Sequence, residues 1–263
     1  IPNITPESDG VNFIGADDER IGTDAAFVGD VNGDGFDDFL IGNGDPLING
    51  QVGLARLVFG QAPTSFGYQY LDAATSTLFI DSSTTYDGTR NIGYSVASAG
   101  DWNNDGVDDF IIGAPFTTYS TGDQNFGKAF VVYGRTLGEG PFDPIFDLAT
   151  LDSTNGFRID DGFTYQGNQL GRDVSGVGDV NGDGIDDILV SSPGVTTTPV
   201  QGGPTYSVGA SYVIFGTDTF FDASFDVLNI DSTNGLVITE TYADNRVGLG
   251  VSRAGDFNGD GID

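Results

Sequence analysis

The sequence predicts an all-β fold: a partial β-propeller of about three four-stranded blades and a truncated fourth. Two observations lead to this prediction. An acidic nine-residue pattern recurs with its first aspartate at positions 30, 101, 179 and 256, in steps of 71, 78 and 77 residues. Each complete period also holds about four short runs of β-branched and aromatic residues, bounded by turn-forming residues. Four strands at so long a period are typical of propeller blades rather than of a sandwich or a solenoid.

The repeat units are expected to follow one another in a single domain that covers residues 1–263. A blade of this size cannot bury its faces alone, so neighbouring units must stack. The expected bounds are approximately 11–81, 82–160, 161–239 and 240–263. The fourth unit stops inside its acidic loop, and the chain starts at Ile1 and contains no methionine. We therefore expect a piece of a longer protein, with the remaining blades in the same chain.

Three sets of apolar runs supply most of the expected strands. No window shows the sustained 3.6-residue apolar stripe of a helix. The run after the acidic loop lies at 39–41, 110–112 and 188–190. The next run lies at 57–60, 130–134 and 212–216, and the last at 78–81, 156–160 and 235–238.

The charge of the chain argues against two classes of partner. Its 39 acidic residues outnumber its 9 basic ones, which gives a formal net charge of −30. Nucleic-acid binding needs clustered Lys and Arg for the phosphates, and anionic membrane surfaces attract basic segments. We expect neither partner. Aromatic residues make up 12% and hydrophobic residues 38% of the chain, which favours a folded protein over a disordered acidic one.

The absence of two residue types limits the chemistry that the chain can perform. It contains no Cys and no His, so disulfides, thiol nucleophiles, imidazole bases and His-ligated zinc are excluded within these residues. No apolar stretch approaches the ~20 residues of a membrane span, and the sequence after Ile1 does not resemble a signal peptide. We expect no membrane insertion.

The acidic pattern, D-x-N-x-D-G-x-x-D, has the spacing of a metal-binding loop. Oxygens at positions 1, 3, 5 and 9 and the carbonyl at position 7 can converge on one hard cation, and Gly at position 6 permits the turn. The three complete sites comprise Asp30, Asn32, Asp34, the Phe36 carbonyl and Asp38; Asp101, Asn103, Asp105, the Val107 carbonyl and Asp109; and Asp179, Asn181, Asp183, the Ile185 carbonyl and Asp187. The partial fourth site comprises Asp256, Asn258, Asp260 and the Ile262 carbonyl.

Calcium is the expected ion, because all-oxygen ligation suits it, with Mg²⁺ or Mn²⁺ as alternatives. Two carboxylates ~4 Å apart repel by about 4 kcal/mol at an effective dielectric constant near 20, which a divalent ion offsets. An EF-hand is excluded because position 12 is Ile41, Ile112 or Val190 in an expected strand. Dockerin loops are helical and recur at shorter spacing. An ordinary turn is the remaining alternative, and the recurrence favours calcium.

Position 8 of each loop is also acidic and has two interpretations. The four residues are Asp37, Asp108, Asp186 and Asp263. They could reach the ion through water or through one of its ligands, or they could be solvated charges that point away from it. We favour the solvated charge.

The loops and their flanks resemble the FG-GAP repeats of integrin alpha subunits and their bacterial relatives. Gly113-Ala114-Pro115 matches the "GAP" element, whereas residues 42–44 and 191–193 depart from it. The "FG" element appears, with an aliphatic residue in place of Phe, as Ile21-Gly22, Ile92-Gly93, Leu170-Gly171 and Val247-Gly248. The resemblance implies a seven-bladed ring in the complete protein, with calcium in the loop between the first and second strands of a blade. It also implies secretion or surface display.

On the face opposite the calcium loops, the resemblance places loops that could bind a protein or glycan ligand. Recurring Thr-Tyr pairs and nearby arginines lie there: 85–86, 164–165 and 241–242, with Arg90, Arg172 and Arg246. They could contact an acidic or sugar partner, but we favour packing between blades. Residues 192–208 are expected to form a flexible or contact loop. Trp102 is expected to pack against its blade rather than to serve as a sugar platform.

The leading functional hypothesis is a non-enzymatic, calcium-binding propeller module of an extracellular or cell-surface adhesion or recognition protein. One alternative is the accessory propeller of a secreted hydrolase, since FG-GAP repeats also accompany phospholipases. Another is a polysaccharide-active propeller that uses carboxylate chemistry. The glutamates at 7, 19, 139 and 240 occupy no matching positions, so such a site would need paired aspartates, and nothing singles out a pair.

Overall fold

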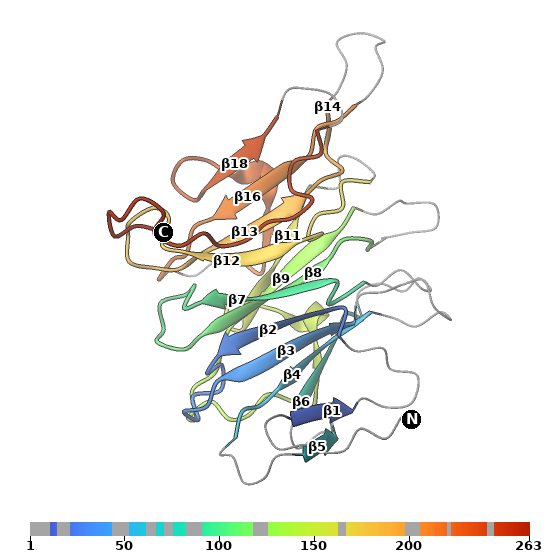
Figure 1. The fold of residues 1–263 in the computed structure, drawn as a ribbon, viewed down its shortest axis with the longest axis vertical. Coiled ribbons are helices and arrows are strands. Elements are labelled where there is room, and N and C mark those ends of the chain that lie inside the picture. Colours follow the sequence, from blue (N-terminus) through green and yellow to red (C-terminus); the bar gives the residue numbers. More distant parts are fainter. Residues whose placement is uncertain are drawn as a thin grey trace.

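The computed structural model describes residues 11–14, 22–43, 53–61, 67–70, 76–82, 91–117, 126–162, 167–197, 206–219, 222–240 and 245–263. Its described part is built of β-strands, with two short 3₁₀ turns. Three larger sheets follow one another in chain order along the molecule (Figure 1).

Each larger sheet contains the four sequential strands of one blade, which pair antiparallel with their neighbours. The first blade holds β2 (Asp24–Gly29), β3 (Asp38–Asn43), β4 (Leu54–Val58) and β6 (Ser76–Ile80). The second holds β7 (Ser95–Gly100), β8 (Asp109–Ala114), β9 (Lys128–Val132) and β11 (Gly156–Asp160). The third holds β12 (Val174–Gly178), β13 (Asp187–Ser192), β16 (Ala210–Ile214) and β18 (Gly235–Thr239). The all-β partial propeller is confirmed.

The first two sheets also have a fifth strand, which the sequence did not predict. β10 (Ile145–Asp147) belongs to the second unit but pairs parallel with β6 of the first. β17 (Ser224–Asp226) belongs to the third unit and pairs parallel with β11 of the second. The 3₁₀ turns η1 (Leu148–Thr150) and η2 (Val227–Asn229) follow them directly. The second and third units therefore each complete the sheet of the unit before them.

Two smaller sheets lie beside the blades in the described residues. β1 (Val11–Ile14) pairs parallel with β5 (Gly67–Tyr70). β14 (Thr196–Thr197) pairs with β15 (Tyr206–Ser207), so the predicted loop at 192–208 is partly a hairpin. Residues 198–205 of that loop lie outside the described part of the chain.

The hydrophobic core lies between neighbouring sheets. One cluster joins the first two blades through residues such as Leu40, Phe79 and Phe110. A second joins the second and third blades and includes Ile111 and Ile188. Every residue of β8 and β13 is buried, because a strand in the middle of a blade is covered on both faces. This explains the continuous apolar runs after the acidic loops.

The glycines of the "FG" and "GAP" elements meet across the blade boundaries. Gly93 has a left-handed φ of +76°, and it packs against Gly42 of the preceding blade so closely that a Cβ on either would overlap backbone atoms. Gly171 and Gly113 face each other in the same way at the next boundary. Only glycine permits both this conformation and this approach.

Candidate metal centre

The acidic loops join the first and second strands of each complete blade, as predicted. They lie between β2 and β3, between β7 and β8, and between β12 and β13. In the first loop, Oδ1 of Asp30 accepts the backbone N–H of Asp34 at 2.9 Å, and Oδ2 accepts that of Gly35 at 2.7 Å. Asn32 donates its side-chain amide to Asp34 at 3.0 Å. The side chains at positions 1, 3 and 5 thus lie on the inside of the turn, where they bond to one another and to backbone N–H groups of the loop.

The other three loops repeat this arrangement. The aspartate at position 1 accepts the N–H groups of positions 5 and 6 in the loops that begin at Asp101, Asp179 and Asp256. The asparagine at position 3 donates to the aspartate at position 5 in each of them. The fourth loop therefore adopts the same local conformation, although no strand is assigned in residues 245–263.

The aspartate at position 9 is buried and anchors the loop to its blade. Asp38 accepts N–H groups from Val31 within the loop and from Gly60 after β4, at 3.1 and 2.8 Å. Burial raises the pKa of Asp38 to about 7, because the carboxylate loses its hydration. Loss of hydration likewise raises the pKa of Asp187 to about 6 and that of Asp109 well above its usual range. These carboxylates are costly to hold ionised in the interior unless a cation is near.

The donor chemistry of the loops fits a hard divalent cation. Carboxylates, amides and carbonyls supply only oxygen. An ionised carboxylate offers about four lone-pair sites, so Asp30 retains capacity after accepting its two N–H bonds. The predicted ligands lie within single loops, but in the part of the chain that the structure describes no three acidic side chains are gathered closely enough to hold an ion as they stand. Calcium binding therefore remains a prediction, which would require the carboxylates to draw together.

The position-8 aspartates differ in their surroundings. Asp37 is exposed, as expected for a solvated charge. Asp108 and Asp186 are partly buried, and each accepts a backbone N–H from the loop of the preceding blade at 3.1 Å. Asp263 forms an ion pair with Arg253 at 2.6 Å. The expectation of a solvated charge is wrong for these three, because the stacking of blades brings each loop against its neighbour.

Two further interpretations can be compared with the structure. Trp102 is fully buried and packs on Phe157 and Tyr133, with ring centroids 4.7 and 6.2 Å away, so its packing role is confirmed. The guanidinium of Arg172 lies 4.9 Å from the ring centre of Tyr94 in the neighbouring unit, as expected for packing between blades. The Thr-Tyr pairs at 85–86, 164–165 and 241–242, together with Arg90, lie outside the described residues, whereas Arg246 is described and exposed.

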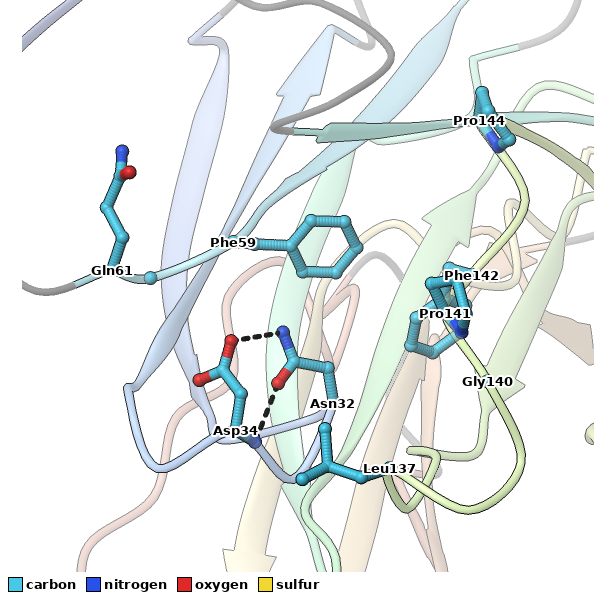
Figure 2. A pocket seen from close by; sticks show the side chains of 10 residues that line it. Asn32, Asp34, Phe59, Gln61, Leu137, Gly140, Pro141, Phe142 and Pro144 are labelled. Carbon is cyan, nitrogen blue, oxygen red and sulfur yellow. Dashed lines mark hydrogen bonds between the residues drawn. The ribbon is translucent and has the colours of Figure 1, made fainter.

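A hollow of about 550 Å³ opens beside the first acidic loop, at the boundary of the first two blades. Figure 2 shows the ring of Phe59 facing Pro141 and Phe142 across the hollow, with Asn32 and Asp34 at one edge. No pattern in the sequence predicts this hollow, because its walls come from three segments that lie far apart in the chain, within residues 32–34, 59–61 and 137–144. A smaller hollow of about 200 Å³ lies beside the second loop, and its lining includes Asn103, Asp105, Tyr133, Thr154 and Thr217.

Comparison with known proteins identifies the repeats. The FG-GAP repeat family matches residues 92–132 and 171–214, two segments that each contain an acidic loop. Bovine phosphatidylinositol-glycan-specific phospholipase D is 32% identical over 213 residues, which cover 68% of this chain and 24% of that protein. Integrin alpha-5 of Xenopus laevis is 30% identical over 192 residues, which cover 70% of this chain and 16% of that protein. Mouse integrin alpha-8 is 35% identical over 114 residues, which cover 42% of this chain and 10% of that protein.

The fold and the loops therefore define a partial β-propeller module. The module contains FG-GAP repeats at residues 92–132 and 171–214, and the chain is homologous to parts of integrin alpha chains and of phosphatidylinositol-glycan-specific phospholipase D. Its matches span about a quarter or less of the length of each of these relatives.

Proposed function

We propose that the acidic loops bind Ca²⁺ and that the ions stabilise the propeller. The observation that carries the proposal is the fourfold recurrence of one oxygen-rich loop with the same internal hydrogen bonds. Burial of the position-9 carboxylates supports it, because a bound cation would offset their desolvation. The ligands would be those predicted from the sequence, in three complete sites and one partial site.

We propose further that the module serves recognition rather than catalysis, in an extracellular or cell-surface adhesion protein. Homology to integrin alpha chains supports this role. The absence of His and Cys from the chain limits the side chains available for catalysis. A protein or glycan ligand would bind the face opposite the calcium loops. In the described residues, no helix has the length and apolar character needed to cross a membrane.

The second candidate is the accessory propeller of a secreted hydrolase. It is favoured by the alignment with the bovine phospholipase D, which covers 68% of this chain. The two candidates differ in what flanks the repeats. A hydrolase domain encoded in the same full-length gene would support the accessory role, whereas binding of the module to a glycan or matrix-protein array would support recognition.

Calorimetry tests the metal proposal directly. A site that binds calcium with a Kd of roughly 10⁻⁴–10⁻³ M, as in extracellular modules, stabilises the fold by about 2.7 kcal/mol at 100 times its Kd. We expect the melting temperature to rise by about 5–10 °C per occupied site in calcium relative to chelator. Sodium chloride at the same ionic strength is the control for screening, and magnesium at the same concentration tests the selectivity of the loops for calcium. A melting temperature that is the same in calcium and in chelator would refute calcium binding.

A further inference from the structure

The position-8 aspartates connect one acidic loop to the loop before it. Oδ2 of Asp108 accepts the backbone N–H of Asp30 at 3.1 Å, across the boundary of the first two blades. Oδ2 of Asp186 accepts the N–H of Asp101 in the same geometry at the next boundary. The residue held in each case is the first predicted ligand of the preceding loop.

The receiving side of this contact requires glycine. Gly29 precedes Asp30 and has a φ of +78°, and a Cβ placed on it would overlap the Asp108 carboxylate. Gly100 stands in the same relation to Asp186, with a φ of +67°. At the third boundary a Cβ on Gly178 would overlap the Asp263 carboxylate. The arrangement thus recurs at three successive boundaries.

We propose that the position-8 aspartate of one loop positions the first calcium ligand of the preceding loop, and so couples calcium binding at neighbouring sites. This inference rests on the proposed calcium binding. Asp108 lies between two predicted ligands of the second loop, the Val107 carbonyl and Asp109, so an ion in that loop would fix its position. Asp108 in turn holds the amide of Asp30, whose carboxylate supplies the first ligand of the first loop. The path consists of covalent neighbours and one hydrogen bond.

Two physical effects can produce this coupling, and one substitution separates them. The Asp108 carboxylate fixes the backbone, and its negative charge also attracts a cation to the first loop. Asp108→Asn keeps an acceptor oxygen but removes the charge, whereas Asp108→Ala removes both. Asp37→Ala is the matched control, because Asp37 holds position 8 of the first loop itself and is exposed.

The experiment is a calcium titration of the full chain followed by hydrogen–deuterium exchange, which gives an occupancy curve for each loop separately. We expect Asp108→Ala to weaken binding in the first loop about tenfold and to speed exchange of the Asp30 amide. Asp108→Asn should keep most of the affinity, and Asp37→Ala should change it by no more than about twofold. In wild type, disabling the second loop with Asp105→Ala should weaken the first about fivefold. In the Asp108→Ala background it should have no further effect.

The outcomes distinguish the two proposals. Absence of binding in wild type would refute the calcium proposal. If the wild type binds calcium, and the occupancy curves of the first loop are the same in Asp108→Ala and Asp37→Ala, only the coupling is refuted. If Asp108→Asn binds calcium in the first loop as weakly as Asp108→Ala does, the effect comes from the charge of Asp108, and the proposal that Asp108 positions the Asp30 ligand is overturned. If Asp108→Ala does not fold, the Asp186→Ala variant, read at the second loop, tests the same relation at the next boundary.

Discussion

The ammonium nitrogen of Lys128 lies 3.2 Å from Oδ2 of Asp81, and both side chains are buried. Lys128 begins β9 of the second blade, and Asp81 directly follows β6 of the first. Burial lowers the pKa of Lys128, and the neighbouring Asp81 charge opposes that shift. The corresponding residues of the other two blades are Leu54 and Ala210, so this boundary has an ion pair in a place where the other units are apolar.

Removing the lysine alone should destabilise the fold strongly. Lys128→Met leaves the Asp81 carboxylate buried without its cation, at a cost of about 3–5 kcal/mol. The double variant Lys128→Met/Asp81→Asn removes both charges and should recover most of that loss. Urea denaturation of the three proteins measures the difference. A single variant as stable as wild type would show that the pair contributes nothing.

The glycine contacts between blades predict a position-dependent effect of alanine. Gly93→Ala places a methyl group against the backbone of Leu54 and Gly42 in addition to straining a left-handed residue. Gly22 holds the same place in the first unit, with a φ of +99° and no described atom near its Cβ position. Gly22→Ala should therefore cost about 1–2 kcal/mol from backbone strain, and Gly93→Ala about 1–3 kcal/mol more. Equal melting temperatures for the two variants would contradict this account of the boundary.

The buried carboxylates predict that stability in chelator decreases as the pH rises. The folded pKa is raised from 3.8 to about 7 for Asp38 and to about 6 for Asp187. Their contribution is complete below pH 3.8 and is lost as the pH rises through these values. Hydrogen bonds lower the pKa of Asp147 and Asp256. Their contribution to stability is therefore lost only as the pH falls below 3.8.

We therefore expect the melting temperature in chelator to fall between about pH 4 and pH 7, the interval from the unfolded to the folded pKa. Asp38→Asn should flatten that slope. Saturating calcium should remove the fall, because the ion competes with protons for the same oxygens. A melting temperature that rises with pH in chelator would show that the position-9 carboxylates do not dominate this range.

Trp102 makes the second loop observable by fluorescence. It is the only tryptophan of the chain and is fully buried. Its backbone N–H donates to Asp109, a predicted ligand, at 3.0 Å. We expect chelation to shift its emission to longer wavelength and to increase acrylamide quenching. The response should be lost in Asp105→Ala, which disables this loop, and kept in Asp183→Ala, which disables the next one. Equal responses in the two variants would show that Trp102 reports global unfolding only.

The sequence predicted the features that each unit carries within itself. The acidic spacing located the loops, and the apolar runs located β3, β8 and β13. The resemblance to FG-GAP repeats placed the loops between the first and second strands of a blade. Pattern and period suffice for these because the interactions involved are local or recur in every unit.

The features that were missed depend on contacts between units. β10 and β17 are three residues long, too short to show a period, and their pairing partner lies in the preceding unit. The contact of Asp108 with Asp30 spans 78 residues, and position 8 alone does not reveal it. The hollow beside Phe59 likewise forms only when two blades meet.

The parallel pairing of β10 with β6 has a consequence for synthesis on the ribosome. The outer edge of the first sheet stays open until the chain has been extended to Asp147, well after β6 has emerged. The same delay applies to the second sheet, which awaits β17. The first two blades are thus completed only when the following unit has been synthesised. That unit covers the exposed sheet edge, where a strand of another polypeptide could otherwise pair.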